Sequence, residues 1–463
     1  MPLIIPAKTL ADDAYEISGS CRFVTDSSSN LSRSFSSTAS SWTVSFWTKL
    51  TDKHNTTTMY PWGFGTSGTD STGNSFSSGG LAYYDEAGGT LVRDTSVLFR
   101  DPNAWSHIVC KNDGGTITLY TNGVQQAAGS GGTSLDGSTF YIGRWPNTSN
   151  PYHFDGYISE FYFIDGTAYS PSTFAETNSN GVWVPIEASP TFGSDGFFCE
   201  FKQTGSSANS SGMGADTSGN GNHLGVGGMG TDHITTDTPT NNFCVWNALE
   251  YSGDTALAEG NTEGYTRDGT ADYHEGARGS IAVSNGKWYW EVKMVEVGDT
   301  SNALFAGIMS ADHSFRNGEE DELLLGTYGM RNSDGDSVIS NGSALAYATY
   351  GASFSDGDIL NFALDMDNNR LYIGKGGSWA DGSGNIDEAS INSYLTLSTT
   401  PSAYMPMVIG YSTGADIKYQ ANFGNAPYSI SSGNADANGY GNFEYAVPSG
   451  FYALCTKNLA EYG

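Results

Sequence analysis

The sequence predicts an all-β protein made of two antiparallel β-sandwiches joined by a connector rich in glycine and serine. The chain has 463 residues, more than one hydrophobic core usually covers, so two domains are expected. Glycine accounts for 60 residues and charged side chains for only 15%, while aromatic residues reach 13%. The aromatic residues cluster in segments of alternating polarity, and no long segment repeats apolar residues at helical spacing, which favours strands over helices.

The first strand pattern lies in Ser41-Trp-Thr-Val-Ser-Phe-Trp-Thr-Lys49, where apolar and polar residues alternate, as in a strand with one buried face. Trp105-Ser-His-Ile-Val109 predicts another strand, on which we expect His107 to point into the core or to form a local hydrogen bond rather than to bind a metal. A strand over 116–121 then ends at Asn122-Gly123, which predicts a type I′ hairpin because both turn positions need a positive φ.

Two further segments complete this pattern. Phe140-Tyr-Ile-Gly143 and Phe154-Asp-Gly-Tyr-Ile-Ser-Glu160 follow the hairpin. The order of these segments resembles the concanavalin A-like jelly roll of laminin G and pentraxin type. In that family a strand with Trp-x-His is followed by an Asn-Gly hairpin, an Ile-Gly strand and a final Phe-x-Gly-x-Ile-x-Glu strand. The resemblance implies such a domain over residues 20–190, preceded by an N-terminal arm over residues 1–19.

The second half alternates in the same way, with Gly-Asp, Asp-Asn-Asn and Gly-Gly clusters at the expected turns. Its segments occur in the order found in SPRY domains, which they resemble: Gly286-Lys-Trp-Tyr-Trp-Glu-Val292, Phe305-Ala-Gly-Ile308, Asp356-Gly-Asp-Ile-Leu-Asn-Phe-Ala-Leu-Asp365, Arg370-Leu-Tyr-Ile-Gly-Lys-Gly-Gly377, Tyr404-Met-Pro-Met-Val408 and Asn422-Phe-Gly424. The resemblance implies a SPRY-like sandwich over residues 248–463 whose loops bind a ligand. One of these loops carries Trp379, which would be either an exposed anchor for a partner or a cap on the core.

The expected connector covers residues 191–247. Its Gly- and Ser-rich part predicts flexibility over about 205–230. Its end is different, because Phe243 and Trp246 are too apolar to remain in water, so we expect this part to pack on the second sandwich. The segment Asp237-Thr-Pro-Thr-Asn-Asn-Phe243 resembles one found in structural proteins of tailed phages, especially marine ones, ahead of a SPRY-like domain.

Composition excludes some classes of partner. Fifty acidic against 20 basic residues give a net charge of −30, which argues against binding to nucleic acid or to an anionic membrane. The five cysteines are scattered and form no Cys-x-x-Cys, so neither a disulfide framework nor a zinc site is expected. Residues 1–8 lack the apolar core of a signal peptide, and no segment is apolar enough to span a bilayer. We therefore expect a soluble protein made in a cytoplasm, without membrane insertion.

The phage resemblance implies a virion structural protein, of the tail-fibre or adhesin type, that binds polysaccharide on the host surface. The alternative is a capsid decoration protein or a baseplate or tail scaffold that binds only other virion proteins. No heptad run or shaft repeat is present, so the protein would be a compact tip or surface attachment. We expect it to be located in the virion as a multi-copy component or homo-oligomer.

An enzyme is not expected. Jelly-roll glycoside hydrolases carry Glu-x-Asp-x-x-Glu on one strand, so that their acids project into one cleft. The nearest candidates here, Glu160 and Asp165, are five positions apart and hence on opposite faces of a strand.

Binding residues are easier to suggest than catalytic ones. Trp145 lies close in sequence to Asn147, Asn150 and Tyr152, and an aromatic face beside amide groups is typical of sugar sites. The other interpretation of this cluster is packing at the solvent edge of the final hairpin. Asp136 and Asp155 are loop acids that would either bind Ca²⁺ or form plain Asp-Gly turns.

Overall fold

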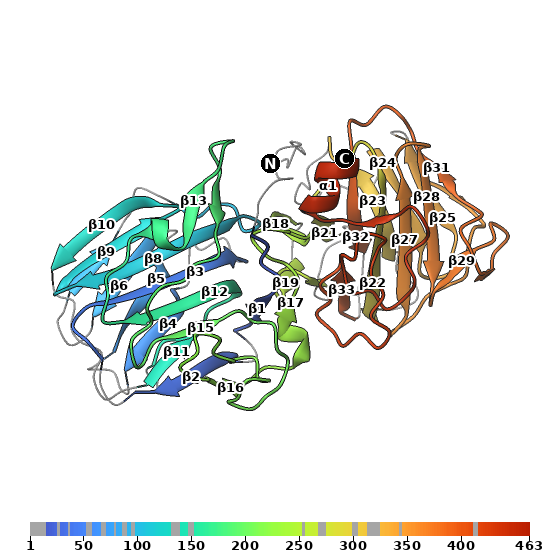
Figure 1. Ribbon diagram of the computed structural model, residues 1–463. Coiled ribbons are helices and arrows are strands. Elements are labelled where there is room, and N and C mark those ends of the chain that lie inside the picture. Colours follow the sequence, from blue (N-terminus) through green and yellow to red (C-terminus); the bar gives the residue numbers. More distant parts are fainter. Residues whose placement is uncertain are drawn as a thin grey trace. The chain divides into compact units, whose positions relative to one another are not determined.

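The computed structural model is shown in Figure 1. It describes residues 15–463 except 26–27, 36–37, 52–57, 66–70, 78–79, 86–89, 94–97, 131–138, 147–151, 252–254, 267–274, 299–303, 313–324, 342–344 and 411–414. The described chain forms two compact units, an N-terminal unit that ends at Asn242 and a C-terminal unit that begins at Phe243. The regular secondary structure of both units is almost entirely antiparallel strands, which confirms the predicted all-β fold class.

Two sheets build the N-terminal unit. Among the described residues, sheet 1 contains, in spatial order, β10 (Val124–Ser130), β9 (Thr116–Thr121), β8 (Trp105–Asp113), β3 (Trp42–Leu50), β12 (Gly156–Asp165), β1 (Ser20–Phe23) and β17 (Ile234–Thr235), with β15 (Phe197–Cys199) paired to β12. Sheet 2 contains β16 (Gly225–Gly227), β2 (Asn30–Ser34), β11 (Thr139–Ile142), β4 (Met59–Gly65), β5 (Thr72–Ser77), β6 (Gly80–Asp85) and β7 (Thr90–Arg93). A short pair, β13 (Ala175–Thr177) and β14 (Trp183–Pro185), and two 3₁₀ turns, η1 (Pro171–Thr173) and η2 (Thr231–His233), complete the unit.

The core of this unit lies between the two sheets. Alternate residues of β3 and β4 contribute to one apolar cluster, in which the rings of Trp42 and Trp62 meet edge to face at 5.8 Å. The alternation in Ser41–Lys49 predicts this inward face. It also predicts an exposed outer face, which is wrong, because every residue of β3 and β4 is buried and both faces of these strands are covered.

The predicted hairpin is present between β9 and β10. Asn122 and Gly123 have φ values of 48° and 79°, as a type I′ turn requires. A Cβ atom on Gly123 would lie 2.7 Å from the Trp183 ring, so the position needs glycine for space as well as for its backbone conformation.

The outer face of sheet 1 holds His107, on β8. Its Nδ1 accepts a hydrogen bond from Trp183 Nε1 at 3.1 Å, which leaves the proton on Nε2 to face Ser45 Oγ at 2.8 Å. Burial lowers the pKa of His107 to about 3, so the ring is neutral. His107 thus forms local hydrogen bonds, as expected.

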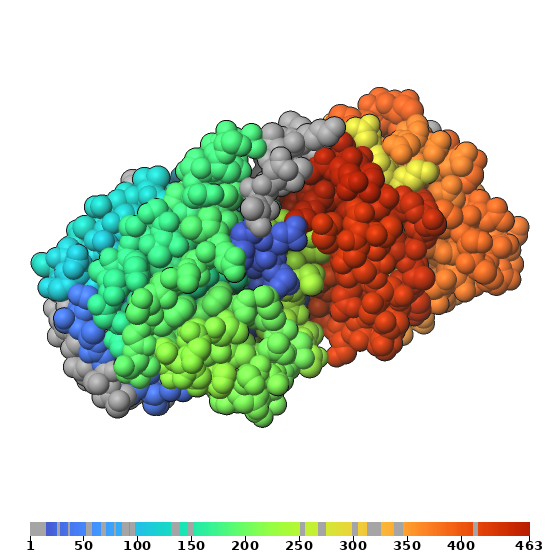
Figure 2. Space-filling model, in the orientation of Figure 1, coloured from blue at the N-terminus to red at the C-terminus, as the bar shows by residue number. Residues whose placement is uncertain are grey.

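The expected flexible connector is built differently. Up to Asn242 it belongs to the N-terminal unit, where β15 pairs with β12, β16 with β2 and β17 with β1. Phe197, Cys199 and Leu224 are fully buried in the core cluster. Figure 2 shows this segment, green to yellow-green, spread over the surface of the N-terminal unit. A few apolar residues are enough to anchor a segment whose average composition resembles a linker.

A buried ion pair fixes the end of this segment. Lys49 Nζ contacts the carboxylate of Asp237, and both side chains are almost completely buried. Lys49 also donates to Asn242 Oδ1 at 2.9 Å, and Trp105 Nε1 donates to Asp237 Oδ1 at 3.2 Å. Residues 237–242 are therefore bound to the N-terminal unit up to Asn242.

Two further sheets build the C-terminal unit. Among the described residues, sheet 3 contains β18 (Trp246–Tyr251), β21 (Glu275–Gly279), β32 (Tyr404–Gly410), β23 (Leu304–Ser310), β24 (Leu325–Arg331), β25 (Ser337–Asn341) and β26 (Leu345–Ala348). Sheet 4 contains β19 (Thr255–Ala258), β20 (Glu263–Thr266), β33 (Ile417–Asn422), β22 (Lys287–Val297), β27 (Ile359–Asp365), β28 (Arg370–Lys375), β29 (Ser378–Ala380) and β30 (Ile386–Glu388), with β31 (Leu395–Thr396) paired to β28 and β34 (Tyr452–Ala453) paired to β22.

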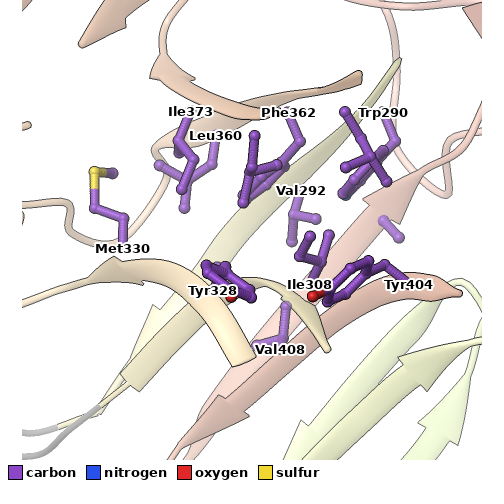
Figure 3. Packing of buried hydrophobic residues seen from close by; sticks show 14 of the residues in the cluster. Trp290, Val292, Ile308, Tyr328, Met330, Leu360, Phe362, Ile373, Tyr404 and Val408 are labelled. Carbon is purple, nitrogen blue, oxygen red and sulfur yellow. The ribbon is translucent and has the colours of Figure 1, made fainter. Parts of the chain in front are cut away.

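The core of the C-terminal unit lies between sheets 3 and 4. Figure 3 shows side chains of the two sheets pointing toward one another, among them Trp290, Val292 and Phe362 from sheet 4 and Ile308, Tyr328 and Val408 from sheet 3. Phe243 and Trp246 are 1% and 0% exposed and belong to apolar clusters of this unit, so the end of the expected connector packs here as predicted.

The outer face of sheet 4 is covered by the C-terminal segment, red in Figure 2. The buried carboxylate of Glu291 binds this segment by accepting the backbone N–H groups of Glu444 and Tyr445 at 3.0 and 2.8 Å. The chain ends in α1 (Thr456–Tyr462), and no helix in the described ranges is long and apolar enough to cross a membrane. All five cysteines are buried with free thiols.

Candidate functional site

The candidate site is a group of aromatic residues on the outer face of sheet 2. The side chains that point into the core are those of Trp62, Phe64, Tyr83 and Phe140. Successive residues of a strand face opposite sides, so the neighbouring positions Gly63, Tyr84 and Tyr141 face outward. The strand register aligns the outward positions in one row across four strands, namely Tyr141, Gly63, Gly73 and Tyr84. The row thus has two tyrosines at its ends and two glycines between them.

The two glycines make room for Trp145 and Pro146. A Cβ atom on Gly63 would lie 2.7 Å from Pro146 Cδ, and one on Gly73 would lie 3.3 Å from Trp145 Cζ3. The chain after β11 therefore folds back across the glycine positions and lays the Trp145 ring over sheet 2. A larger residue at either glycine would displace Trp145 and Pro146 from sheet 2.

Other aromatic rings surround Trp145. Its centroid lies 4.3 Å from that of Tyr60 and 5.8 Å from that of Tyr84, and Tyr60 lies 6.1 Å from Tyr152. We call the set Tyr60, Tyr84, Tyr141, Trp145 and Tyr152 the aromatic platform. Such flat faces can stack on the C–H faces of sugar rings, while the tyrosine hydroxyls can bind sugar hydroxyls.

The platform contains two of the residues that the sequence suggested. Trp145 is only 4% exposed and serves as the platform's packed centre, which agrees with the packing interpretation of this cluster. Tyr152 is 41% exposed and has a φ of 25°, an uncommon backbone conformation for tyrosine. Asn147 and Asn150 lie outside the described residues.

Sequence reasoning missed Tyr60, Tyr84, Tyr141 and Arg144. The Arg144 guanidinium carbon lies 4.9 Å from the centroid of the Tyr141 ring, and its Nε donates to the Trp145 carbonyl at 3.1 Å. Gly63, which lies between Trp62 and Phe64 on β4, was a feature of the sequence that indicated a covered outer face.

The calcium site gains no support in the described ranges, where no group of three or more His, Cys, Asp or Glu side chains is placed to hold a metal. Asp155 accepts a hydrogen bond from Thr51 Oγ1 at 3.0 Å. Asp136 lies outside the described residues.

Trp379 is not the exposed anchor that one interpretation suggested. It is 5% exposed, on β29, in an apolar cluster with Tyr289, whose ring centroid lies 6.5 Å away. The alternative interpretation, in which Trp379 caps the core, agrees with this buried position. Its apolar neighbours come from distant parts of the chain, so its exposure could not be deduced from the surrounding loop residues.

The two acids considered for catalysis are occupied in different ways. Glu160 is 3% exposed and accepts hydrogen bonds from the hydroxyls of Tyr162 and Tyr15 at 2.8 and 3.2 Å. Burial raises the pKa of Glu160 to about 7. Asp165 instead accepts the backbone N–H of Ala39 at 2.7 Å. The two carboxyl groups therefore serve separate hydrogen-bond networks.

The domain that carries the platform has recognisable relatives. Residues 24–174 match the model of the concanavalin A-like lectin/glucanases superfamily. This concanavalin A-like match includes every residue of the platform. No curated protein matches the whole sequence or a part of it.

Solved structures that match parts of this chain include the SPRY domain of human HERC1, at 16% identity and a TM-score of 0.29, covering 38% of this chain and 96% of that one. A heptameric SAP-like pentraxin from Limulus polyphemus has 16% identity and a TM-score of 0.29, with 38% and 95% covered. A candidate carbohydrate-binding protein from Bacteroides ovatus has 16% identity and a TM-score of 0.30, with 46% of this chain and 58% of that one covered.

Proposed function

We propose that this protein binds carbohydrate through the aromatic platform of its concanavalin A-like domain and does not hydrolyse it. The observation that carries the proposal is the exposed Tyr152 at the edge of a packed aromatic surface, within the segment that matches the concanavalin A-like lectin/glucanases superfamily. The burial of Glu160 under two tyrosine hydroxyls supports binding over hydrolysis, because its carboxyl group is committed to the fold.

We further propose that the protein is a tail-fibre or adhesin-type component of a tailed-phage particle, and that the carbohydrate is a polysaccharide of the host surface. The resemblance of Asp237–Phe243 to phage structural proteins supports this assignment. Many copies on one particle would raise the effective concentration of binding sites, so that sites of low affinity can together attach the particle to a cell.

The full chain, multimerised on streptavidin, should bind a subset of a glycan array. Tyr152→Ala should weaken this binding roughly fivefold to tenfold, since a stacked aromatic ring contributes on the order of 1 kcal/mol beyond its buried area. Tyr394→Ala is the matched control, because Tyr394 is also 41% exposed but lies in the C-terminal unit.

A blank array with folded protein would contradict the proposal and favour the scaffold alternative, in which the protein binds only other virion proteins. Equal losses for the two tyrosine variants would show that the platform is not the site. Release of reducing sugar from a bound polysaccharide, abolished by Glu160→Gln, would contradict the non-enzymatic part.

A further inference from the structure

We propose that the aromatic platform takes an acidic glycan, one with carboxylate-bearing sugars such as uronic acids, and that Arg144 binds the carboxylate. The inference rests on the proposed function, because it names the class of carbohydrate for the same site. It comes from the position of Arg144, from the lack of an acidic partner for it among the described residues, and from the charges around it.

Arg144 lies at one end of the platform. Its side chain stacks on Tyr141, the first residue of the outward row, and Nε is fixed by the Trp145 carbonyl. A guanidinium held against an aromatic ring in this way keeps a defined plane, so less conformational entropy is lost when it binds a ligand. A sugar stacked on the neighbouring rings would therefore place its substituents within reach of a preorganised donor group.

The terminal nitrogens of Arg144 have no carboxylate partner among the residues that the structure describes. Other arginines of the chain do have one, since Arg22, Arg278 and Arg331 each contact an aspartate or glutamate. The chain has 50 acidic and only 20 basic residues, so carboxylates are in excess. An arginine without one, beside a cluster of tilted aromatic rings, is a position where an external acid can take that place.

The local charges permit an anionic ligand despite the net charge of −30. At physiological ionic strength the Debye length is about 8 Å, so distant acidic residues are largely screened. His153 is next to the site, where it forms a β-bridge with Arg144. Burial and the charge of Arg144 both lower the pKa of His153, so this ring is neutral at pH 7 and Arg144 supplies the positive charge.

A carboxylate fits this donor better than a hydroxyl does. The planar guanidinium can donate two parallel hydrogen bonds to a carboxylate, and such charge-assisted bonds are roughly twice as strong as neutral ones. Neutral sugars would still stack on the rings. The charge of the ligand is therefore expected to add to binding by the platform and not to replace it.

The test compares matched polymers on the full chain. Polygalacturonate, alginate and hyaluronate are each paired with their carboxyl-reduced form, which keeps the linkage and loses the charge, in 0.15 M NaCl at pH 7. At least one acidic polymer should bind about tenfold more tightly than its reduced form, which corresponds to about 1.4 kcal/mol. Arg144→Gln should abolish this preference, so that the acidic and the reduced form of each polymer bind equally, while Arg144→Lys should keep part of it.

Arg370→Gln is the control, because Arg370 also stacks on a tyrosine, with its guanidinium carbon 4.2 Å from the Tyr394 ring centroid, but in the C-terminal unit. It should keep the preference in full. If acidic and reduced polymers bind equally and Tyr152→Ala loses this binding, the role of Arg144 is overturned and the proposal that the platform binds carbohydrate stands. The absence of binding to every glycan would overturn both proposals, and a preference that survives in Arg144→Gln would overturn this one.

Discussion

Glu160 shows how one residue can make stability depend on pH. It sits at a bulge in β12 with a φ of 50°, and its carboxyl group is buried against Tyr15 and Tyr162. Its pKa of about 7 in the folded protein lies above the ordinary value of 4.5. The carboxyl group must therefore stay protonated in the fold at pH values where it ionises in the unfolded chain.

This difference predicts the direction of the pH effect. The stabilising contribution is fully present below about pH 4.5 and is lost as the pH rises through about 7, by at most roughly 3 kcal/mol. Glu160→Gln should remove this part of the pH dependence, because a neutral amide oxygen can still accept from the tyrosines. Urea unfolding at pH 5 and pH 8 measures it, with Glu176→Gln, at an exposed position of β13, as the control. An unchanged pH dependence in Glu160→Gln would refute this account.

At the scale of elements, the segment before Asn242 depends on the ion pair between Lys49 and Asp237. Asp237→Asn keeps the shape of the side chain but removes the carboxylate charge that faces the buried Lys49 ammonium group. Breaking a buried pair from one side costs about 3–5 kcal/mol, so we expect a loss of that size in the free energy of unfolding. Urea unfolding of the full chain at pH 7 measures it.

The comparison variant is Asp232→Asn. Asp232 Oδ2 lies 3.7 Å from Arg22 Nη2; the Arg22 side chain is buried, but that of Asp232 is 24% exposed, and Arg22 Nη2 also donates to the Asp232 carbonyl at 2.8 Å, a bond that Asn can keep. The loss in the free energy of unfolding should therefore be smaller than that of Asp237→Asn. Similar effects of both substitutions would mean that the Lys49 pair is more hydrated than the structure indicates.

An element could be predicted from the sequence when the residues that determine it are neighbours in the chain. The alternation in Ser41–Lys49 and the Asn122-Gly123 turn are properties of neighbouring residues, and both elements form as expected. The strands of 191–242 were not expected, because Leu224 stands isolated in a polar, Gly-rich sequence, Phe197 lies in a short apolar run with no strand-length alternation, and the partners of both are far away in the chain. The exposure of Trp145 and Trp379 was hard to predict for the same reason, since only the folded sheets decide what covers a ring.

At the scale of the whole molecule, the limits of the N-terminal unit can be tested. A fragment over residues 12–242 contains β15, β16 and β17 and should fold cooperatively. A fragment over residues 12–190 lacks them and leaves the core without Phe197, Cys199 and Leu224. Removing large buried side chains costs about 2–5 kcal/mol each, so the shorter fragment should not fold.

Circular dichroism during heating distinguishes the two fragments, because only a folded sandwich gives a cooperative transition. A full-length chain serves as the reference. Equal transition midpoints for both fragments would show that residues 191–242 add nothing to the stability of the sandwich, contrary to their burial.

The buried thiols give the molecule a set of internal reporters. Cys21, Cys110 and Cys199 lie in the core of the N-terminal unit, while Cys244 and Cys455 are buried in the C-terminal unit. Burial raises the pKa of the Cys21 and Cys110 thiols, so these groups stay protonated and unreactive while the sheets are closed. An alkylating reagent can reach any of the five only when the surrounding structure opens. The masses of the labelled peptides would therefore time the opening of each sandwich separately, within one unmodified chain.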